Sequence, residues 1–247
     1  MTEFFVGTHM PNWLWANPPF PHKLFVSHRR LKRQKSYKQA TVDWALDSGG
    51  FTELNLHGKW VETPLAYIAA VRRYMVEIGR LLWAAPQDWM CEPFVLAKTG
   101  KTVRQHQART VANFLLLREL APDLPFIPVL QGWRAADYLE HADLYERMGI
   151  DLRAEPLVGM GTFCRRADLK PIRRLVSYLW RQGVKMHGFG LKTDGLSLYG
   201  HQLASSDSLA WSRGARMKNR CGGDHRSCNN CPTWAAEWGH RVKATIR

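Results

Sequence analysis

The sequence lacks the features that mark membrane-spanning and exported proteins. Its 247 residues contain no uninterrupted apolar run of the length that a membrane-spanning helix needs, which is roughly 18 residues. The first residues, Met1 to Phe5, have neither the basic lead nor the long apolar segment of a signal peptide. We therefore expect a protein of the cytoplasm.

Cysteine is scarce along most of the chain, with five residues in all. An odd number of cysteines without an export signal argues against a disulfide framework. Three of them, Cys221, Cys228 and Cys231, lie close together near the end of the sequence, and the Cys-x-x-Cys spacing of the last two is typical of a metal site. Three thiolates and one imidazole make a closed tetrahedral site, so we predict structural Zn²⁺ with His240 as the fourth ligand and His225 as its competitor. The alternative is a cluster of reduced surface thiols.

Acidic residues are also few, with 21 Asp and Glu against 35 Lys and Arg, and the formal net charge is +14. A charge of this size bears on partners rather than on fold. The basic residues gather in blocks at 29–38, 165–166, 173–174 and 213–220. A solvated charged face would explain any one block. Together, and with 11 tryptophans, the blocks favour a polyanionic partner, and we predict nucleic acid.

Strand-like and helix-like patterns alternate along the chain. Short apolar runs bounded by turn residues predict strands, whereas Ile68, Val71 and Met75 repeat at helical spacing. The expected strands are 3–8, 42–46, 83–87, 126–130, 152–158, 185–189 and 203–206. The expected helices are 64–83, 102–120, 135–148 and 168–182.

Strands separated by single helices predict right-handed βαβ units and a parallel sheet. We expect an α/β fold, a (β/α)8 TIM barrel with a C-terminal zinc-binding segment, because this closed form suits the length and spacing better than an open doubly wound sheet. Seven strands are named above, and we expect an eighth whose position the sequence pattern does not show. Since the chain has no internal repeat, low-complexity tract or linker, residues 1–247 are expected to form a single domain, with a zinc-binding subregion at about 218–242.

Polar residues and glycines recur where the expected strands end. They are Asp47, Asp88, Gln131, Gly159 to Gly161, Gly190 and Asp207. In a TIM barrel the carboxyl ends of the strands meet at one face, which carries the active site. Two carboxylates can divide nucleophilic and proton-transfer work at an anomeric carbon, and a carboxylate with an amide can read a purine edge. Taken singly, such residues are also typical of turns and helix caps.

Four segments resemble motifs of the tRNA-guanine transglycosylases. Residues 47–51, Asp-Ser-Gly-Gly-Phe, are similar to the motif of the same sequence in that family, and residues 129–132, Val-Leu-Gln-Gly, resemble its Val-Gln-Gly segment. Residues 187–190, His-Gly-Phe-Gly, resemble its Met-Gly-Val-Gly turn, and residues 206–208, Ser-Asp-Ser, match the position of its nucleophilic aspartate. The order and approximate spacing of these motifs agree from about residue 41 to residue 240.

Within this superfamily the chain is most similar to the DpdA-type 7-deazaguanine DNA transglycosylases of phages and bacteria. That resemblance depends on residues 88–92, 128–133, 164–166 and 206–211. It implies an enzyme that exchanges guanine in DNA for a free 7-deazaguanine base, in the host cytoplasm if a phage encodes it. The chain is much shorter than a typical tRNA enzyme and lacks an appended RNA-binding domain, which favours DNA over tRNA. Its zinc spacing also departs from the Cys-x-Cys-x-x-Cys with a distant His of the tRNA enzymes.

The resemblance also implies a role for each matching residue. Asp207 would attack C1′ of the nucleotide and form a covalent glycosyl-enzyme, and Asp47 would act as general acid and base. Asp88 and Gln131 would hold the edge of the base. The further substrate-binding positions are Ser48, Gly49, Gly132, Gly159, Met160, Gly161, His187 and Gly190, and a buried core position is the alternative for His187. Because the target guanine must leave the base stack, we expect a flipped or single-stranded substrate.

Residues around this site are predicted to contact the substrate polymer. We expect Arg165, Arg166 and Lys101 to bind phosphate, and Trp133 and Trp211 to contact a base or sugar. Three other functions use the same residues: a tRNA enzyme, a non-catalytic nucleic-acid-binding subunit, and a hydrolytic glycosidase in which water replaces the incoming base. A homodimer and a helper protein are both compatible with the sequence.

Overall fold

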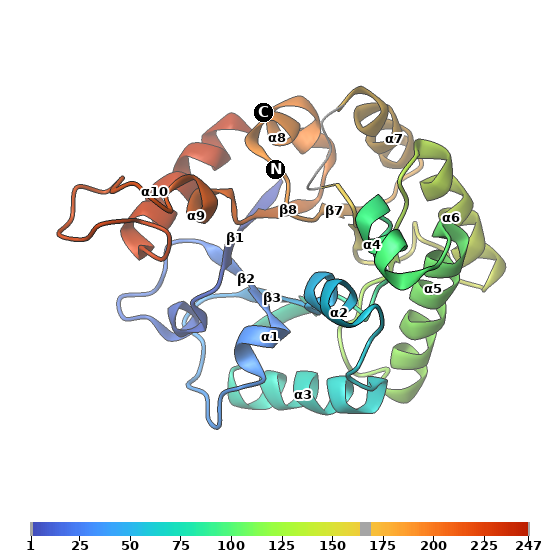
Figure 1. Ribbon diagram of the computed structural model, residues 1–247, viewed down its shortest axis with the longest axis horizontal. Helices are drawn as coiled ribbons and strands as arrows, with labels where there is room; N and C mark the ends of the chain where they lie inside the picture. Colours follow the sequence, from blue (N-terminus) through green and yellow to red (C-terminus); the bar gives the residue numbers. More distant parts are fainter. Residues whose placement is uncertain (1, 164–168, 247) are drawn as a thin grey trace.

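The computed structural model describes residues 2–163 and 169–246, and a sheet of eight parallel strands lies at its centre (Figure 1). The strands are β1 (Glu3–Thr8), β2 (Lys23–Ser27), β3 (Trp44–Asp47), β4 (Leu81–Ala84), β5 (Val129–Leu130), β6 (Val158–Met160), β7 (Met186–Gly188) and β8 (Ser205–Ser208). Their order in the sheet is β4-β3-β2-β1-β8-β7-β6-β5. Strands that are consecutive in sequence are therefore neighbours, except for β4 and β5 at the two ends of the sheet, and β1 pairs with β8.

The two ends of this sheet meet between β4 and the segment that leads into β5. A parallel bridge joins Ala84 to Phe126. The Ala84 N–H donates to the carbonyl oxygen of Pro125 at 2.9 Å, and the Ile127 N–H donates to the carbonyl oxygen of Ala84 at 3.2 Å. The sheet therefore curls into a circle, which confirms the predicted barrel class over an open doubly wound sheet.

The eighth strand, which the sequence pattern did not locate, is β2. Its apolar part is only Leu24-Phe25-Val26, between a proline-rich segment and the first basic block. It pairs with β1 on one side and β3 on the other, with Phe25 opposite both Gly7 and Ala45. Such a short run carries little periodicity of its own, and its place in the sheet comes from the two longer strands that flank it.

Helices follow most strands and cover the outside of the barrel. They are α1 (His28–Leu31), α2 (Gly50–His57), α3 (Pro64–Glu77), α4 (Pro93–Thr99), α5 (Val103–Leu120), α6 (Ala135–Arg147), α7 (Lys170–Arg181), α8 (Thr193–Tyr199), α9 (Ala210–Gly214) and α10 (Pro232–Thr245), with 3-10 turns η1 (Pro11–Trp15) and η2 (Gly200–Gln202). The Thr63 side chain caps α3, and Thr102 with Gln105 forms a capping box for α5. Predicted helix 64–83 ends earlier than expected, at Glu77, because Gly79 and Arg80 both adopt positive φ and turn the chain into β4.

Large side chains fill the inside of the barrel. Phe5, Phe25, Ala45, Trp83 and Ile127 form one buried cluster, which is separate from the larger core between the strands and the helices. The barrel is therefore a packed core, and a binding site is left to the loops at the carboxyl ends of its strands.

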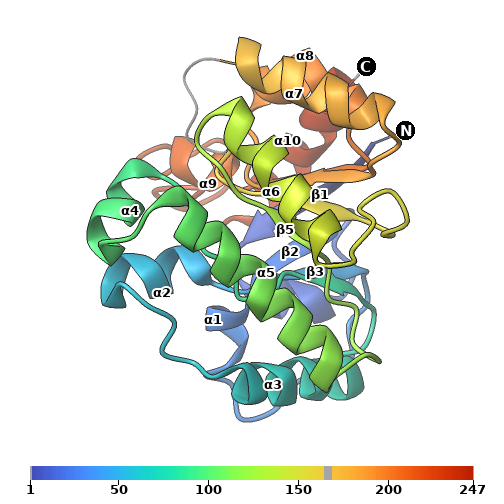
Figure 2. The same ribbon diagram turned by 90° about the vertical axis from the view of Figure 1, so that its right-hand side faces the viewer.

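The outer layer follows the chain around the barrel. Figure 2 shows α7, α6, α5 and α3 in succession on one side, each in contact with the next. On the other side α10 packs against β1, where the rings of Phe4 and Trp238 lie 5.8 Å apart. None of the helices in residues 2–163 and 169–246 combines the length and the apolar character needed to cross a membrane.

Candidate active site

A pocket of about 240 Å³ opens at the carboxyl ends of the strands. It is lined by Phe25, Asp47, Gly50, Phe51, Ala85, Asp88, Met90, Glu92, Gln131, Gly161, Thr162, Phe189, Gly190 and Asp207. Six of the predicted site residues are among them: Asp47, Asp88, Gln131, Gly161, Gly190 and Asp207. The parallel barrel brings these residues together from segments that are up to 160 positions apart in the sequence, from Asp47 to Asp207.

Asp207 lies near the end of β8, and its carboxylate is held from the neighbouring strand. Its Oδ1 accepts a hydrogen bond from the backbone N–H of Gly190 at 2.8 Å and lies 3.3 Å from Nε2 of His187. Gly190 has φ of 61°, a left-handed conformation that glycine adopts without strain. This turn aims its N–H group at the carboxylate.

Asp47 ends β3 on the same pocket wall. Burial raises the pKa of this carboxyl, hydrogen bonds from the Ser27 side chain and the Gly49 backbone oppose the rise, and the negative charge of Asp207 adds to it. Gly49 has φ of 83°, and a Cβ there would lie 2.7 Å from Cγ of Arg29. The glycine after Asp47-Ser48 is thus required by the turn and by the close approach of α1.

Asp88 and Gln131 form a hydrogen-bonded pair inside the pocket. Nε2 of Gln131 donates to Oδ2 of Asp88 at 2.5 Å, and the Ser48 hydroxyl donates to Oδ1 at 3.3 Å. Burial raises the pKa of Asp88 to about 7, although the hydrogen bond from Gln131 lowers it, and the charge of Asp47 contributes to the rise. A carboxyl with this pKa changes charge near neutral pH, and the amide beside it fixes its orientation.

Thr162 and Glu92 belong to the pocket and were not predicted from the sequence. The Thr162 hydroxyl lies 2.6 Å from Oε1 of Gln131 and 3.3 Å from Oε2 of Glu92, and it accepts a hydrogen bond from the backbone N–H of Cys91 at 3.1 Å. Thr162 has φ of 60°, which is uncommon for a residue with a Cβ. The one signal in the sequence was position, since Thr162 directly follows the glycine turn and Glu92 ends the segment that begins at Asp88.

The glycine turn at the end of β6 has a different use from the backbone contacts that we predicted. The N–H groups of Gly159 and Gly161 donate to the carbonyl oxygens of Pro128 and Leu130, at 2.8 Å and 2.9 Å. They are therefore part of the sheet, and only Gly161 of the predicted Gly159-Met160-Gly161 group lines the pocket. A Cβ at Gly161 would lie 2.1 Å from Nε2 of Gln131, so this glycine leaves the space that the Gln131 side chain occupies.

Four other predicted substrate-binding residues lie behind the pocket wall. The Ser48 hydroxyl donates a hydrogen bond to the Asp88 carboxylate, and Gly49 packs against Arg29. A Cβ at Gly132 would lie 2.9 Å from the Tyr138 ring, so Gly132 packs against α6. His187 is fully buried beneath Asp207.

The predicted contacts with the polymer have mixed outcomes. Arg165 and Arg166 fall outside the residues that the structure describes. Nζ of Lys101 donates to the carbonyl oxygen of Thr99 at 3.3 Å, and Lys101 does not line the pocket. Trp211 is 2 % exposed, and its indole N–H donates to the carbonyl oxygen of Gly7 at 2.8 Å, so its role is structural and the predicted contact with a base or sugar is wrong. Trp133 also lies outside the pocket lining.

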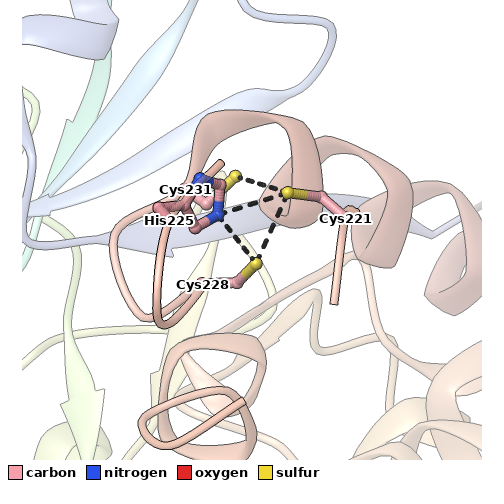
Figure 3. Close-up of side chains that lie close together, drawn as sticks. All are labelled: Cys221, His225, Cys228 and Cys231. Carbon is pink, nitrogen blue, oxygen red and sulfur yellow. Dashed lines mark hydrogen bonds between the residues drawn. The ribbon is translucent and has the colours of Figure 1, made fainter. Parts of the chain in front are cut away.

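A second cluster of functional side chains follows α9 (Figure 3). One ligand atom each from Cys221, His225, Cys228 and Cys231 lies within 4.8 Å of all the others. Nε2 of His225 is 3.3 Å from Sγ of Cys221 and 3.1 Å from Sγ of Cys228, and Sγ of Cys221 is 3.5 Å and 3.6 Å from the sulfurs of Cys228 and Cys231. Metal–sulfur bonds of about 2.3 Å in a tetrahedron place sulfurs about 3.8 Å apart, so the four residues fit a Zn²⁺ ion.

Backbone groups support the same interpretation. The N–H groups of Arg220, Gly223 and Trp234 donate to the sulfurs of Cys228, Cys221 and Cys231, at 3.0 Å, 3.4 Å and 3.4 Å. Such donors stabilise thiolates, and Cys231 in addition caps the N-terminus of α10, where the helix dipole favours negative charge.

The fourth member of this cluster is His225, which corrects the prediction of His240. His240 is nine residues beyond Cys231, and α10 begins directly after that cysteine. A helical rise of about 1.5 Å per residue carries His240 about 13 Å away along the axis. Its ring packs instead against His22, with 4.4 Å between the ring centroids.

Comparison with known proteins gives one family. A family model described as DpdA, DeoxyPurine in DNA protein A, matches residues 1–247. No curated protein has significant sequence similarity to the chain.

Proposed function

The chain belongs to the DpdA family, and we propose that it exchanges guanine in DNA for a free 7-deazaguanine base through a covalent aspartyl-glycosyl intermediate. Membership implies a DNA-guanine transglycosylase role in deazapurine modification of DNA. The observation that carries the finer proposal is that Asp47 and Asp207 line one pocket together with the Asp88–Gln131 pair. We also propose that residues 1–247 act as one barrel domain, with the metal-binding subregion at about 218–242.

The two aspartates divide the work of base exchange. In the first step an oxygen of Asp207 forms a bond to C1′ while the C1′–N9 bond breaks, and guanine takes the bonding electrons together with a proton from Asp47. In the second step the incoming base gives its N9 proton to Asp47 and attacks C1′, and the C1′–oxygen bond to Asp207 breaks. One pocket serves both steps because the leaving and incoming bases occupy it in turn.

The electrostatics of the pocket support this division. Burial and the negative charge of Asp207 both raise the pKa of Asp47, which favours Asp47 as the carboxyl that supplies the proton in the first step. Neighbouring carboxyls whose protonation states differ are a common basis for assigning the acid and the nucleophile.

The Asp88–Gln131 pair is proposed to bind the base edge. An ionised Asp88 accepts hydrogen bonds from the ring N–H and the exocyclic amine of guanine, and the second N–H of the Gln131 amide donates to the guanine carbonyl oxygen. The first N–H of that amide is already used by Asp88. A 7-deazaguanine presents the same edge, so both bases fit one set of contacts.

Basic residues on the pocket face are proposed to bind the DNA backbone. Arg30 belongs to α1, which follows β2, and Arg216 follows α9, which comes after β8, so both lie on segments that leave the carboxyl ends of strands. Both side chains are exposed, and both are near His9, since burial and then the charges of Arg30 and Arg216 lower the pKa of His9. We include Arg165, Arg166 and Lys101 in the proposed phosphate contacts on the strength of their position in the sequence.

The Cys221, His225, Cys228 and Cys231 cluster is proposed to bind structural Zn²⁺. Bound zinc supplies a cross-link between the loop after α9 and the start of α10. The loop so fixed carries Lys218, Arg220 and Arg226, all exposed. The metal site would then support DNA binding by ordering part of the basic surface rather than by taking part in base exchange.

The test is release of radiolabelled guanine from DNA and from tRNA, measured in parallel with a 7-deazaguanine supplied. We expect release from DNA only, dependent on the added base, and abolished in Asp207→Asn. Asp47→Asn should slow exchange while leaving DNA binding unchanged. Release from tRNA would mean that the substrate polymer is tRNA. Release from DNA without the added base would mean that the protein is a hydrolytic glycosidase. Full exchange by Asp207→Asn would overturn the proposed nucleophile.

A further inference from the structure

His187 is buried inside the barrel, directly below the pocket. It belongs to β7 and lies opposite Ser205 of β8 in the sheet register. Its ring is enclosed by aromatic side chains, with centroid distances of 4.6 Å to Trp83, 4.8 Å to Phe189 and 5.7 Å to Phe25. His187 is 0 % exposed and does not line the pocket, so it does not face the space in which a base would bind. A polar ring in such an apolar enclosure needs partners for both nitrogens.

Both partners come from β8. Nδ1 of His187 lies 2.8 Å from Oγ of Ser205, and Nε2 lies 3.3 Å from Oδ1 of Asp207. An ionised carboxylate can only accept, so Nε2 carries the hydrogen. In the neutral ring Nδ1 is then the acceptor, and the Ser205 hydroxyl donates to it. Ser205 and Asp207 are two positions apart on one strand, which places both side chains on the same face of the sheet.

The two oxygens of Asp207 therefore have different surroundings. Oδ1 receives two donors, Nε2 of His187 and the backbone N–H of Gly190. Among residues 2–163 and 169–246, neither of these donors nor any other bonds to Oδ2. The carboxylate is thus anchored through one oxygen, and the lone pairs of the other oxygen are available to a ligand in the pocket.

We propose that His187 is a positioning residue that anchors Oδ1 of Asp207, with Ser205 fixing its tautomer, so that Oδ2 is the oxygen that attacks C1′. This inference rests on the proposed function of Asp207. When Oδ2 bonds to C1′ and the C1′–N9 bond breaks, Oδ1 becomes the carbonyl oxygen of the ester and keeps both donors. When the incoming base breaks the C1′–Oδ2 bond, the electron pair returns to the carboxylate, and the same two donors stabilise the charge.

The role predicts a specific difference between two amide substitutions. Nε2 of glutamine is the same number of bonds from Cα as Nε2 of histidine, so His187→Gln retains a donor aimed at Asp207. The asparagine amide nitrogen corresponds instead to Nδ1 and reaches toward Ser205. His187→Phe fills the aromatic enclosure without any donor.

We expect kcat for exchange to fall roughly 10- to 100-fold in His187→Asn and His187→Phe, the range found when outer hydrogen-bond partners of metal-binding side chains are removed. His187→Gln should recover most of that loss. KM for the free base and Kd for DNA should stay within about 2-fold of the wild type in all three, because His187 touches neither ligand. Ser205→Ala, which frees the tautomer but leaves the ring in place, should give a smaller loss of kcat. A folding defect would instead change KM and thermal stability together in every variant.

A second measurement does not depend on activity. Nitrogen NMR of the His187 ring in the intact chain should show the hydrogen on Nε2, and Ser205→Ala should introduce the tautomer with the hydrogen on Nδ1. A ring protonated at Nδ1 in the wild type would overturn the inference. A wild-type kcat in both His187→Asn and His187→Phe would also overturn the inference. If Asp207→Asn were inactive in the same assay, the proposed function of Asp207 would still stand. Absence of exchange by the wild type would overturn the proposed function. The NMR result alone would then decide whether His187 donates to Asp207.

Discussion

Gln131 donates its side-chain N–H to the carboxylate of Asp88 at 2.5 Å, and the two residues come from the ends of neighbouring strand–loop units of the barrel. Thr162 holds the other end of the Gln131 amide at 2.6 Å. The amide is therefore fixed before any base arrives, with one N–H on Asp88 and one left for a ligand. Preorganised polar groups of this kind lower the entropic cost of binding.

The raised pKa of Asp88 predicts how stability depends on pH. The folded protein binds the Asp88 proton up to about pH 7, whereas the unfolded chain releases it near its ordinary value of 3.8. Because the folded state binds more protons between these values, the free energy of unfolding falls as pH rises through that window and then levels off. We expect Asp88→Asn, which resembles the protonated form, to remove the part of this fall that lies between about pH 5 and about pH 8, roughly 3 kcal/mol. Denaturant unfolding at about pH 5 and about pH 8 measures it.

The control is Asp123→Asn. Arg72 donates to this exposed carboxylate and lowers its pKa, so its contribution has the opposite sign and is small because the pair is solvated. An equal fall of stability with pH in the wild type and in Asp88→Asn would show that Asp88 is ionised throughout this range.

The same ionisation predicts how base binding depends on pH. An ionised Asp88 accepts from the guanine edge, whereas a protonated one has lost an acceptor and gained a donor. KM for the 7-deazaguanine should therefore fall as pH rises through about 7, the pKa of Asp88. Asp88→Asn should show a high KM with no such dependence. Steady-state exchange across this range checks the prediction, and a falling KM in the variant would assign the titration to another group.

Gly161 predicts a loss of base binding from a single added methyl group. A Cβ at this position would lie 2.1 Å from Nε2 and 2.5 Å from Cδ of Gln131, so Gly161→Ala must displace the amide from Asp88. We expect KM for the free base to rise about 10-fold or more, since leaving a buried hydrogen-bonding group without its partner costs roughly 1–3 kcal/mol. Gly214→Ala is the matched control, because nothing lies within 4 Å of an added Cβ there, and it should leave KM unchanged.

The parts of the site that follow from the sequence are those with local signals. Asp47 and Asp207 stand at strand ends, and a barrel brings strand ends together whatever the detailed packing. The same reasoning placed Asp88 and Gln131 in one pocket. Strand β2 was missed because its apolar run is only three residues long, and its strand conformation is imposed by β1 and β3.

The parts that do not follow depend on side-chain directions set by tertiary structure. Thr162 is 31 positions from Gln131 in the sequence and has a left-handed backbone conformation. No local sequence pattern predicts its contact with Gln131 or its positive φ. For His187 the sequence left a pocket position and a core position open, and the pleat directs the ring into the barrel interior, against Trp83 and Phe189. His240 and His225 are both near the cysteines in sequence, and only the start of α10 at Pro232 decides between them.

The metal cluster predicts different effects for these two histidines. His225→Ala should weaken zinc binding strongly, because it removes one of the four ligand atoms, whereas His240→Ala should bind zinc like the wild type. Zinc content after dialysis, and competition with a chromophoric chelator, measure the difference. Chelation should also lower thermal stability, since a structural site couples metal binding to folding. Loss of zinc from His240→Ala with retention in His225→Ala would reverse the assignment.

The basic residues of the pocket face predict how DNA affinity depends on salt. Each phosphate contact releases condensed counterions, so removing one cation should reduce the slope of log affinity against log salt concentration by about 1. We expect this for Arg30→Gln and for Arg216→Gln, with little change in the exchange rate at saturating DNA. Lys185→Gln is the matched control, because Lys185 is exposed just before β7 and therefore lies at the amino end of the barrel, opposite the pocket. Titration of labelled duplex at several salt concentrations gives all three slopes. Equal slopes for the three variants would mean that DNA lies elsewhere on the surface, whereas a reduced slope for Arg30→Gln and Arg216→Gln alone would place the duplex across α1 and the loop that carries the metal cluster.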